Sequence, residues 1–277
     1  MSSSALYIIP TPIGNLGDIT ERAKETLATV DFIAAEDTRV GGKLLMLLGV
    51  KKPLVSYHEH SNNKVIQDIC QRILQGESCG LITDAGTPAV SDPGEKLVAC
   101  CAEAGVSICA LPGPCAAVTA ISASGLASRR FCFEGFLPEN KRERKERIDE
   151  LAREKRTFVI YISPHDAEDY LKELSDVLGD RKCVLAKELT KIHERYFRGT
   201  LNDVSREFAS LSAPEKKGEY LLVCEGMPEN EVFWADMTVE EHVERYIALG
   251  LSKMDACKQV AKDRGVGKGE IYKIINS

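Results

Sequence analysis

The sequence predicts an α/β protein, built from two α/β domains of the same general type and a small all-helical C-terminal extension. Along the first half, short apolar runs typical of buried strands alternate with helical patterns, as in βαβ units around a mostly parallel sheet. Each of these strands is followed by a loop rich in Gly, Pro or polar residues. The 277 residues also suffice for one large domain or two of ordinary size.

The first half of the chain carries five expected strands, over residues 6–9, 32–35, 54–57, 81–82 and 106–111. Helices are expected between them. One is capped by Asp18 or Thr20 and ends near Val30, and others cover residues 65–74 and 95–104. We assign residues 1–124 to an N-terminal α/β domain.

The pattern changes after residue 124, and a second set of strands and helices begins. Expected strands cover residues 131–136, 158–162, 184–186 and 220–224, with helices over 167–178 and 201–211. Residues 125–228 are therefore assigned to a second α/β domain.

The C-terminal part, residues 236–277, reads as a compact helical tail. Helices are expected over 239–249, 254–261 and 271–275, with a Gly-containing turn before the last one. Bases outnumber acids between Lys253 and Lys273, so the tail could carry a local positive surface. An equally good interpretation is a capping or dimerising element.

Composition excludes several classes of protein. The chain has 36 Lys and Arg against 42 Asp and Glu, so no overall positive charge attracts nucleic acid. No apolar run is long enough to cross a bilayer, and the polar N-terminal residues do not resemble a signal peptide. The ten cysteines include no C-x-x-C pair and mostly fall in apolar runs. We therefore expect reduced cysteines in a cytoplasmic protein that does not contact a membrane.

The segment 81–94 is the strongest local signal for a ligand site. An apolar strand ends at Asp84 and leads through a Gly- and Pro-rich loop into a helix. Gly86 allows a close approach of the backbone to a ligand, and the Asp84 carboxylate can accept hydrogen bonds from hydroxyls or an amine. The alternative is an ordinary strand-to-helix turn capped by Ser91 and Asp92.

Four further loops follow strands in the same way, over residues 10–18, 36–39, 58–60 and 112–117. The carboxyl ends of parallel strands lie at one edge of a sheet, so these loops should gather around one cleft. Small residues from Cys115 onward open a helix whose first turn could lie against a flat ligand.

Familiar catalytic motifs are absent from the sequence. It contains no Walker A loop, no G-x-G-x-x-G after the first strand, no H-E-x-x-H and no G-x-S-x-G. His58 and His60 flank Glu59 without further ligands at a recognisable spacing, so we predict no metal site.

The ordered loops resemble the tetrapyrrole-methylase superfamily, and within it the enzymes that methylate small-subunit ribosomal RNA. The resemblance covers about residues 5–226 and is carried by TPIGNLGD (11–18), EDTR (36–39), DAGTP (84–88), PGPCAA (112–117), FEGFLP (133–138), KELTK (187–191) and GEYLLVCEG (218–226). It implies S-adenosyl-L-methionine as cofactor, bound between two α/β domains of a homodimer. The implied reaction is 2′-O-methylation of a cytidine ribose in the decoding region of bacterial 16S rRNA, free or within the small ribosomal subunit.

Candidate site residues follow from the loops and the resemblance together. The cofactor candidates are Pro10, Asp84, Gly86, Thr87, Ser91, Cys115, Ala116 and Tyr161. The resemblance puts the loops of four catalytic candidates near the cleft: Glu36, Asp37, Glu188 and Lys191. The RNA-binding candidates are Arg39, Lys141, Arg142, Arg144 and Lys145. The basic run 141–147 could equally be a solvated helix face with internal ion pairs.

Two other functions stay open at this point. A methylase of a small tetrapyrrole would use the same donor pocket. A non-catalytic RNA-binding assembly factor could keep the pocket for structural reasons, although the intact series of loops argues against it.

Overall fold

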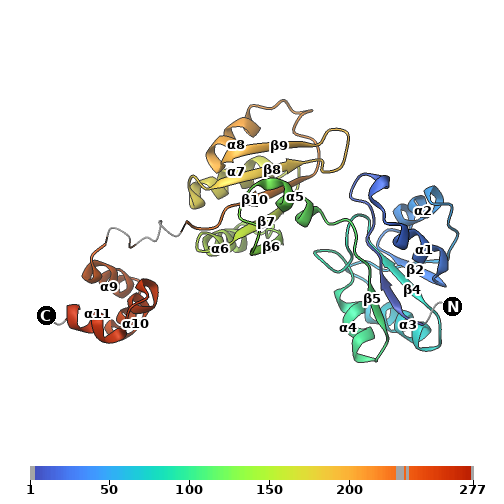
Figure 1. The fold of residues 1–277 in the computed structure, drawn as a ribbon, viewed down its shortest axis with the longest axis horizontal. Coiled ribbons are helices and arrows are strands. Elements are labelled where there is room, and N and C mark those ends of the chain that lie inside the picture. Colours follow the sequence, from blue (N-terminus) through green and yellow to red (C-terminus); the bar gives the residue numbers. More distant parts are fainter. Residues whose placement is uncertain (1–3, 229–233, 235–236, 276–277) are drawn as a thin grey trace. The chain divides into compact units, whose positions relative to one another are not determined.

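The chain folds into two compact units, one up to Glu225 and one from Gly226 onward. The structure is a computed structural model that describes residues 4–228, 234 and 237–275. The first unit contains two five-stranded sheets, and the second is helical (Figure 1). Residues 1–3, 236 and 276–277, which fall inside the predicted domain ranges, lie outside the described residues.

The first sheet, predicted to be mostly parallel, is entirely parallel, with the order β3-β2-β4-β1-β5. Its strands are β1 (Leu6–Ile8), β2 (Phe32–Ala35), β3 (Leu54–Ser56), β4 (Cys79–Ile82) and β5 (Ile108–Ala110). The helices between them are α1 (Glu21–Thr29), α2 (Thr38–Leu47), α3 (Asn63–Leu74) and α4 (Glu95–Glu103), with a short 3-10 helix η1 (Leu16–Asp18) before α1. Thr20, rather than Asp18, caps α1 by accepting the Ala23 N–H.

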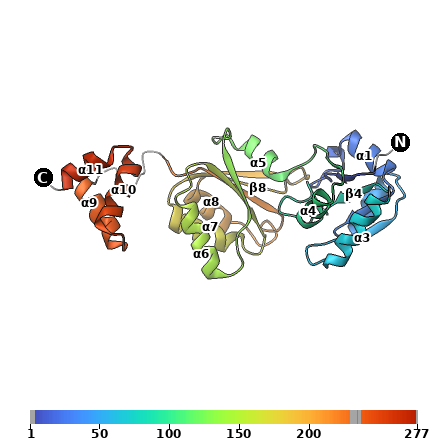
Figure 2. The ribbon, with the colours of Figure 1, turned by 90° about the horizontal axis from the view of Figure 1, so that it is seen from below.

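Helices cover both faces of this sheet, because successive strand residues point to opposite sides. Phe32 and Ala34 pack in a core with residues of α3 and α4, such as Ile69. Ile33 and Ala35 pack in a separate core with residues of α1 and α2. Figure 2 shows α1 and α3 on opposite sides of β4. Both faces being covered explains why the strands are continuous apolar runs.

The second sheet is mixed, with the order β6-β7-β10-β8-β9. β6 and β7 run parallel, whereas the other neighbours are antiparallel. The strands are β6 (Phe131–Phe136), β7 (Thr157–Ile162), β8 (Lys182–Lys187), β9 (Arg195–Thr200) and β10 (Tyr220–Cys224). The helices α6 (Lys141–Leu151), α7 (Ala167–Leu178) and α8 (Leu201–Ala209) cover one face.

Helix α5 (Ala116–Ser124) covers the other face of the second sheet. Ala117, Ala120 and Ile121 pack against strand residues that include Val159 and Val223. Figure 2 shows α5 on one side of β8 and α7 and α8 on the other. The helix precedes the predicted domain boundary at residue 125, yet it packs on the sheet that follows. The chain therefore passes directly from the carboxyl edge of the first sheet to the face of the second.

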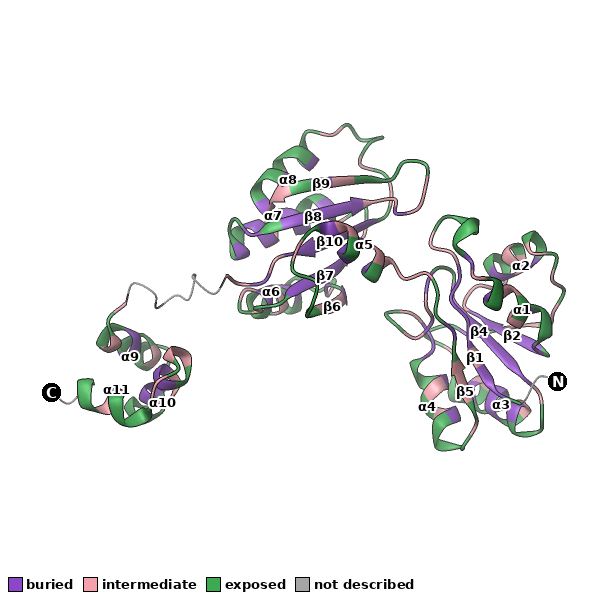
Figure 3. Cartoon of the chain, in the orientation of Figure 1, coloured by how far each residue is buried: buried purple, intermediate pink, exposed green. Residues whose placement is uncertain are grey.

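The second unit is a bundle of three helices, α9 (Val239–Ala248), α10 (Lys253–Arg264) and α11 (Lys268–Ile275), in agreement with the predicted tail. Its small core contains Val243, Cys257, Val260 and Ile271. Figure 3 shows the buried residues as stripes on these helices and as continuous runs along the central strands of both sheets. Among the described residues, no helix is long and apolar enough to span a membrane.

Candidate active site

Three loops at the carboxyl edge of the first sheet are tied together by hydrogen bonds. The backbones of Thr11 and Gly86 exchange two N–H···O bonds, at 2.9 and 3.1 Å. The Thr11 hydroxyl donates to the Thr83 carbonyl at 3.1 Å, and the Thr87 hydroxyl donates to the Pro114 carbonyl at 3.0 Å. These bonds fix the loops after β1, β4 and β5 relative to one another.

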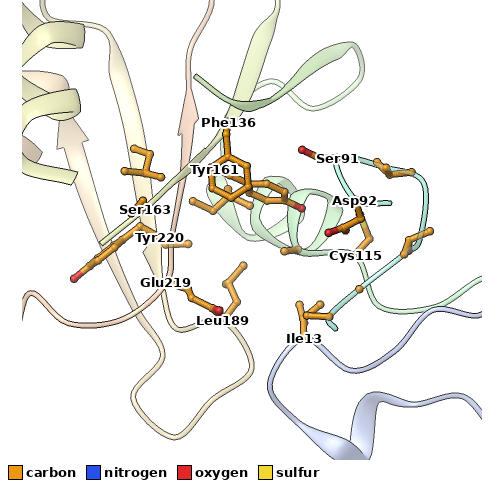
Figure 4. A pocket seen from close by; sticks show the side chains of 18 of the residues that line it. Ile13, Ser91, Asp92, Cys115, Phe136, Tyr161, Ser163, Leu189, Glu219 and Tyr220 are labelled. Carbon is orange, nitrogen blue, oxygen red and sulfur yellow. The ribbon is translucent and has the colours of Figure 1, made fainter. Parts of the chain in front are cut away.

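A cavity of about 410 Å³ lies beside these loops, within the range of small-molecule sites. Residues of the first sheet's loops form one side of it and residues of the second sheet the other (Figure 4). Six of the eight cofactor candidates line it: Gly86, Thr87, Ser91, Cys115, Ala116 and Tyr161. The two halves of the first unit therefore share one site.

The other two cofactor candidates, Pro10 and Asp84, are not among the lining residues. Pro10 packs against Gly113, where an added Cβ would lie 2.6 Å from the Pro10 Cβ. Asp84 accepts the backbone N–H of Asp37 at 3.2 Å, at the ends of two neighbouring strands. Both residues support the loops behind the cavity.

Carboxylates gather behind the cavity at the ends of β2 and β4. Glu36 accepts the backbone N–H of Asp84 at 3.4 Å. Burial raises the pKa of both carboxyls above their ordinary values. Asp92, which does line the cavity, has its pKa raised to about 6 by burial and by the charges of Glu36 and Asp84. This edge of the site is therefore acidic.

Asp37 and Arg39 pair with each other at the start of α2. Two nitrogens of the Arg39 guanidinium donate to the Asp37 carboxylate, the shorter bond being 2.6 Å. These bonds lower the pKa of Asp37 to about 2, and its carboxylate also caps the Arg39 backbone N–H. The Arg39 side chain is 90% exposed, so it still faces solvent.

The other catalytic candidates lie in the β8–β9 loop, on the side of the second sheet. The Lys191 ammonium donates to Glu188 at 2.9 Å and to Glu219 at 2.8 Å. Burial acts to raise the pKa of Glu188, but the bonds from the Glu219 amide and Lys191 outweigh it and lower the pKa. Glu219 lines the cavity, so this network extends to the ligand site.

Aromatic rings form the wall above the cavity. Tyr161 lies 5.1 Å from Phe133 and 5.2 Å from Phe136, measured between ring centroids. Burial, with the nearby Cys115 and Asp92, raises the pKa of Tyr161 to about 12. The phenol is therefore neutral at physiological pH, and this wall is aromatic and largely apolar.

Several lining residues are absent from the sequence-based candidates, among them Ile13, Asp92, Phe136, Leu189, Glu219 and Tyr220. Asp92 was interpreted only as a possible helix cap. Instead Gly94 is the N-cap of α4, and no side chain caps this helix. The signal for a functional role was the position of Asp92 within the loop 81–94. Glu219 likewise lay within the GEYLLVCEG segment.

The basic run of α6 requires one correction. Arg144 is only 5% exposed and donates to Glu173 at 2.7 Å and to the carbonyls of Pro138 and Glu139. The prediction that Arg144 contacts RNA is therefore wrong, because its guanidinium is already occupied inside the fold. Lys141, Arg142 and Lys145 are exposed on the same helix, with Arg142 paired to Glu146.

Within the described residues, no group of three or more His, Cys, Asp or Glu is arranged to hold a metal ion. The ten cysteines are free thiols, and each of them is buried or partly buried.

Comparison with known proteins gives a consistent picture. Residues 5–205 match the family model described as Tetrapyrrole (Corrin/Porphyrin) Methylases. The chain is 43% identical to a ribosomal RNA small subunit methyltransferase I from Halalkalibacterium halodurans, covering 98% of this chain and 94% of the relative. It is 48% identical to the protein of that name from Haemophilus influenzae, covering 82% and 80%.

Solved structures share the fold at lower identity. A cobalt precorrin-4 methyltransferase of cobalamin biosynthesis matches with a TM-score of 0.58 and 20% identity, over 79% of this chain and 94% of that chain. A uroporphyrin-III C-methyltransferase from Thermus thermophilus, solved with S-adenosyl homocysteine, matches with a TM-score of 0.54 and 17% identity, over 80% and 97%. The family model and the curated relatives together show that the chain belongs to the tetrapyrrole-methylase family, in the branch of the ribosomal RNA small subunit methyltransferase I proteins.

Proposed function

We propose that this protein transfers the methyl group of S-adenosyl-L-methionine to the ribose 2′-oxygen of a cytidine in the decoding region of 16S rRNA. Relatives that match nearly the whole chain are named as methyltransferases of small-subunit ribosomal RNA, and this supports the same class of substrate here. The cytidine ribose, a homodimer and a cytoplasmic location belong to the proposal through the family resemblance.

The observation that carries the proposal is the shared cavity, whose lining suits this cofactor. Gly86 and Ala116 leave room on one side, and Tyr161 and Phe136 offer aromatic rings that can contact a purine. The carboxylates of Glu36 and Asp84 make the nearby edge acidic, as suits a ligand with a positive sulfonium and ammonium. When bound, the cofactor supplies a methyl group on positively charged sulfur. The S-adenosyl homocysteine in the Thermus thermophilus structure lends support.

The protein's own task is mainly alignment, because displacement at a methyl carbon needs the attacking oxygen, carbon and sulfur in line. The tied loops at Thr11, Gly86 and Thr87 hold one side of the cavity rigid. Lys191 holds Glu219 on the other side. A ligand and an RNA nucleotide placed between these sides would meet in a fixed geometry.

RNA binding needs local positive charge, since the chain as a whole carries a net charge of −6. The exposed cations of the first unit include Arg39, Lys141, Arg142 and Lys145. In the second unit, Lys262, Lys268 and Lys273 are exposed or partly exposed around the α10–α11 turn. We propose that both sets contact phosphates of the substrate.

The test is methyl transfer from labelled cofactor to small subunits that lack the modification. A 2′-O-methyl group protects the adjacent phosphodiester from alkali, so an alkaline ladder should lack one band. Label on a base atom would contradict the ribose assignment. Label on a small tetrapyrrole instead of RNA would favour the tetrapyrrole methylase, and RNA binding without any transfer would favour an assembly factor.

A matched pair of variants on α5 tests the cavity itself. Ala116→Phe should fill part of the cavity and lower cofactor affinity at least about 100-fold, measured by calorimetry. Val118→Phe adds a similar ring on the same helix at a residue that is 54% exposed, and should bind the cofactor normally. Equal affinities for the two variants would exclude this cavity as the cofactor site.

A further inference from the structure

Asp92 differs from the other acidic residues around the cavity. Those residues accept hydrogen bonds or form ion pairs within the protein: Glu36, Asp37, Asp84, Glu188 and Glu219. Asp92 lines the cavity, and among the described residues its carboxylate accepts no hydrogen bond and joins no ion pair. Its lone pairs are therefore available to a ligand or substrate.

The backbone around Asp92 is held in an unusual conformation. Ala89 and Ser91 have backbone φ values of +65° and +61°, which residues other than Gly rarely adopt. The Ala89 N–H donates to the Pro93 carbonyl at 3.3 Å. Strained backbone of this kind persists only where the surroundings enforce it, and it is concentrated at functional sites.

Part of this enforcement comes from the second sheet. At Gly135, in the irregular part of β6, an added Cβ would lie 2.7 Å from the Ser91 hydroxyl oxygen. The neighbouring Phe136 and Tyr161 line the same cavity. The loop that carries Asp92 is thus packed against the wall opposite the first sheet. Asp92 does not serve as a helix cap, since Gly94 is the N-cap of α4.

The charged groups that face Asp92 favour its protonation. Burial raises its pKa to about 6, and the carboxylates of Glu36, just after β2, and Asp84, just after β4, add to this effect. From the second sheet it faces the neutral phenol of Tyr161. A base is most effective when its pKa lies close to the working pH, so Asp92 is a better base than an ordinary aspartate.

We propose that Asp92 is the catalytic base of the methyl transfer, a role that rests on the function proposed above. As the ribose 2′-oxygen bonds to the methyl carbon, its O–H proton moves to the Asp92 carboxylate. The carbon–sulfur bond breaks, and its electron pair stays on the sulfur, which loses its positive charge. The neutral Asp92 carboxyl then releases the proton to water.

Figure 4 shows Glu219 across the cavity from Asp92. Its carboxylate is 76% exposed and accepts a hydrogen bond from the Lys191 ammonium at 2.8 Å, so it already has a positively charged partner. It is therefore suited to positioning a bound group rather than accepting a proton. Of the two carboxylates that line the cavity, Asp92 is the one that can act as the base.

The experiment compares wild type, Asp92→Asn, Asp92→Glu and the control Asp68→Asn. Asp68 lies exposed on α3 and undergoes the same chemical change away from the cavity. Single-turnover methylation of small subunits is measured from pH 5 to 8.5, and cofactor affinity is measured by calorimetry. In a separate readout on the free proteins, NMR follows the carboxyl carbons of labelled aspartates.

We expect Asp92→Asn to lower the rate at pH 7.5 by about 10²- to 10⁴-fold, with cofactor affinity changed less than about threefold. In wild type the rate should rise tenfold per pH unit up to about pH 6 and then level off. This rise should be absent from Asp92→Asn and partly retained in Asp92→Glu. The free wild-type protein should show one aspartate that titrates near pH 6, and Asp92→Asn should lack it.

A rate for Asp92→Asn within about threefold of wild type would overturn the proposal. So would a missing aspartate titration near pH 6. If Asp92→Asn does not fold, Asp92→Glu and Asp92→Ser take its place in the same comparison. Failure of the proposed function looks different, because wild type and Asp68→Asn would then also bind no cofactor or transfer no methyl group.

Discussion

Lys191 and Glu219 form an ion pair, with 2.8 Å between the ammonium nitrogen and a carboxylate oxygen. The pair joins the β8–β9 loop to the residue just before β10, where Glu219 lines the cavity. Gly14, from the loop after β1, lies directly against the Lys191 side chain. An added Cβ there would lie 2.6 Å from Cγ and 2.9 Å from Cε of Lys191. The absence of a side chain at residue 14 therefore allows Lys191 to reach Glu219.

We predict that Gly14→Ala destabilises the protein and weakens cofactor binding. The methyl group has no room beside Lys191, and the φ of +142° at this residue is unfavourable for Ala. The expected loss is about 1–3 kcal/mol in the free energy of unfolding, measured in urea. Cofactor affinity, measured by calorimetry, should fall as Lys191 moves away from Glu219.

The matched control for this change is Gly42→Ala. Gly42 lies within α2 without a positive φ, and an added Cβ would meet its nearest neighbour at 3.6 Å. Ala is a better helix former than Gly, so this variant should gain up to about 1 kcal/mol. Equal stability and equal cofactor affinity for the two variants would show that packing at Gly14 does not matter.

The first sheet could be predicted almost completely, because its strands appear as short apolar runs and its central strands, β2 and β4, are buried on both faces. β9 could not. As an edge strand with one partner, it has one fully buried residue, Phe197, between the exposed Arg195 and Arg198, and this pattern resembles a polar connection. The sequence also could not indicate which of the two sheets helix α5 covers. The small residues of this helix, such as Ala117 and Ala120, pack on the second sheet, but small residues can pack closely on any sheet.

At the site, the rule that loops gather at the carboxyl ends of parallel strands identified in advance the side of the cavity that the first sheet forms. It could not distinguish Asp92, which lines the cavity, from Asp84, which lies behind it, since both occur in one loop. Arg144 shows a second limit. Whether a cation in a mixed run points inward depends on a distant partner, here Glu173, which lies 29 residues further along the chain. Predicted domain boundaries near residues 125 and 228 stay predictions.

A second prediction separates Arg144 from its neighbour Arg142. Arg144→Met should lower the free energy of unfolding by about 2–4 kcal/mol, because it leaves Glu173 and two carbonyls without their donor. Arg142→Met removes a pair whose side chains are 88% and 63% exposed, and should cost at most about 0.5 kcal/mol. Denaturant unfolding of both variants measures the difference. A similar cost for the two would contradict the structural role of Arg144.

A third prediction concerns RNA affinity and its dependence on salt. Replacing Lys141, Arg142 and Lys145 together by Ala should weaken binding to small subunits and leave cofactor affinity unchanged. The slope of log affinity against log salt should become shallower by about 0.7–0.9 for each phosphate that the variant no longer neutralises, because fewer counterions are released. Filter binding at several salt concentrations measures this slope.

The control for that variant removes the same charge elsewhere. Lys51, Lys64 and Lys172 are exposed, and replacing all three by Ala changes the net charge equally. If both triple variants change affinity and slope by the same amount, α6 has no specific role in binding. The effect would then come only from the net charge.

The last prediction concerns the helical unit and pH. His242 is fully buried, accepts a hydrogen bond at Nδ1 from Arg264 at 3.2 Å, and has Nε2 3.4 Å from the Asp263 carboxylate. Burial lowers the pKa of His242 below 6.5. The Asp263 charge acts to raise this pKa, and the charges of Arg264 and Arg245 act to lower it further. The folded unit therefore favours neutral histidine. The unfolded chain protonates this histidine more readily than the folded unit does. The free energy of unfolding is therefore highest above about pH 7 and falls as the pH decreases below 6.5.

The loss of stability should not exceed about 1.4 kcal/mol per pH unit. Trp234, the one tryptophan in the chain, stacks on the His242 ring at 4.9 Å and reports on this unit by fluorescence. Urea unfolding followed through Trp234 should show a lower midpoint at pH 5.5 than at pH 7.5. His242→Gln should be less stable at both pH values but lose this difference, whereas His165→Gln, at an exposed site, should keep it. Equal midpoints for wild type at the two pH values would mean that protonation of His242 does not oppose folding of the helical unit.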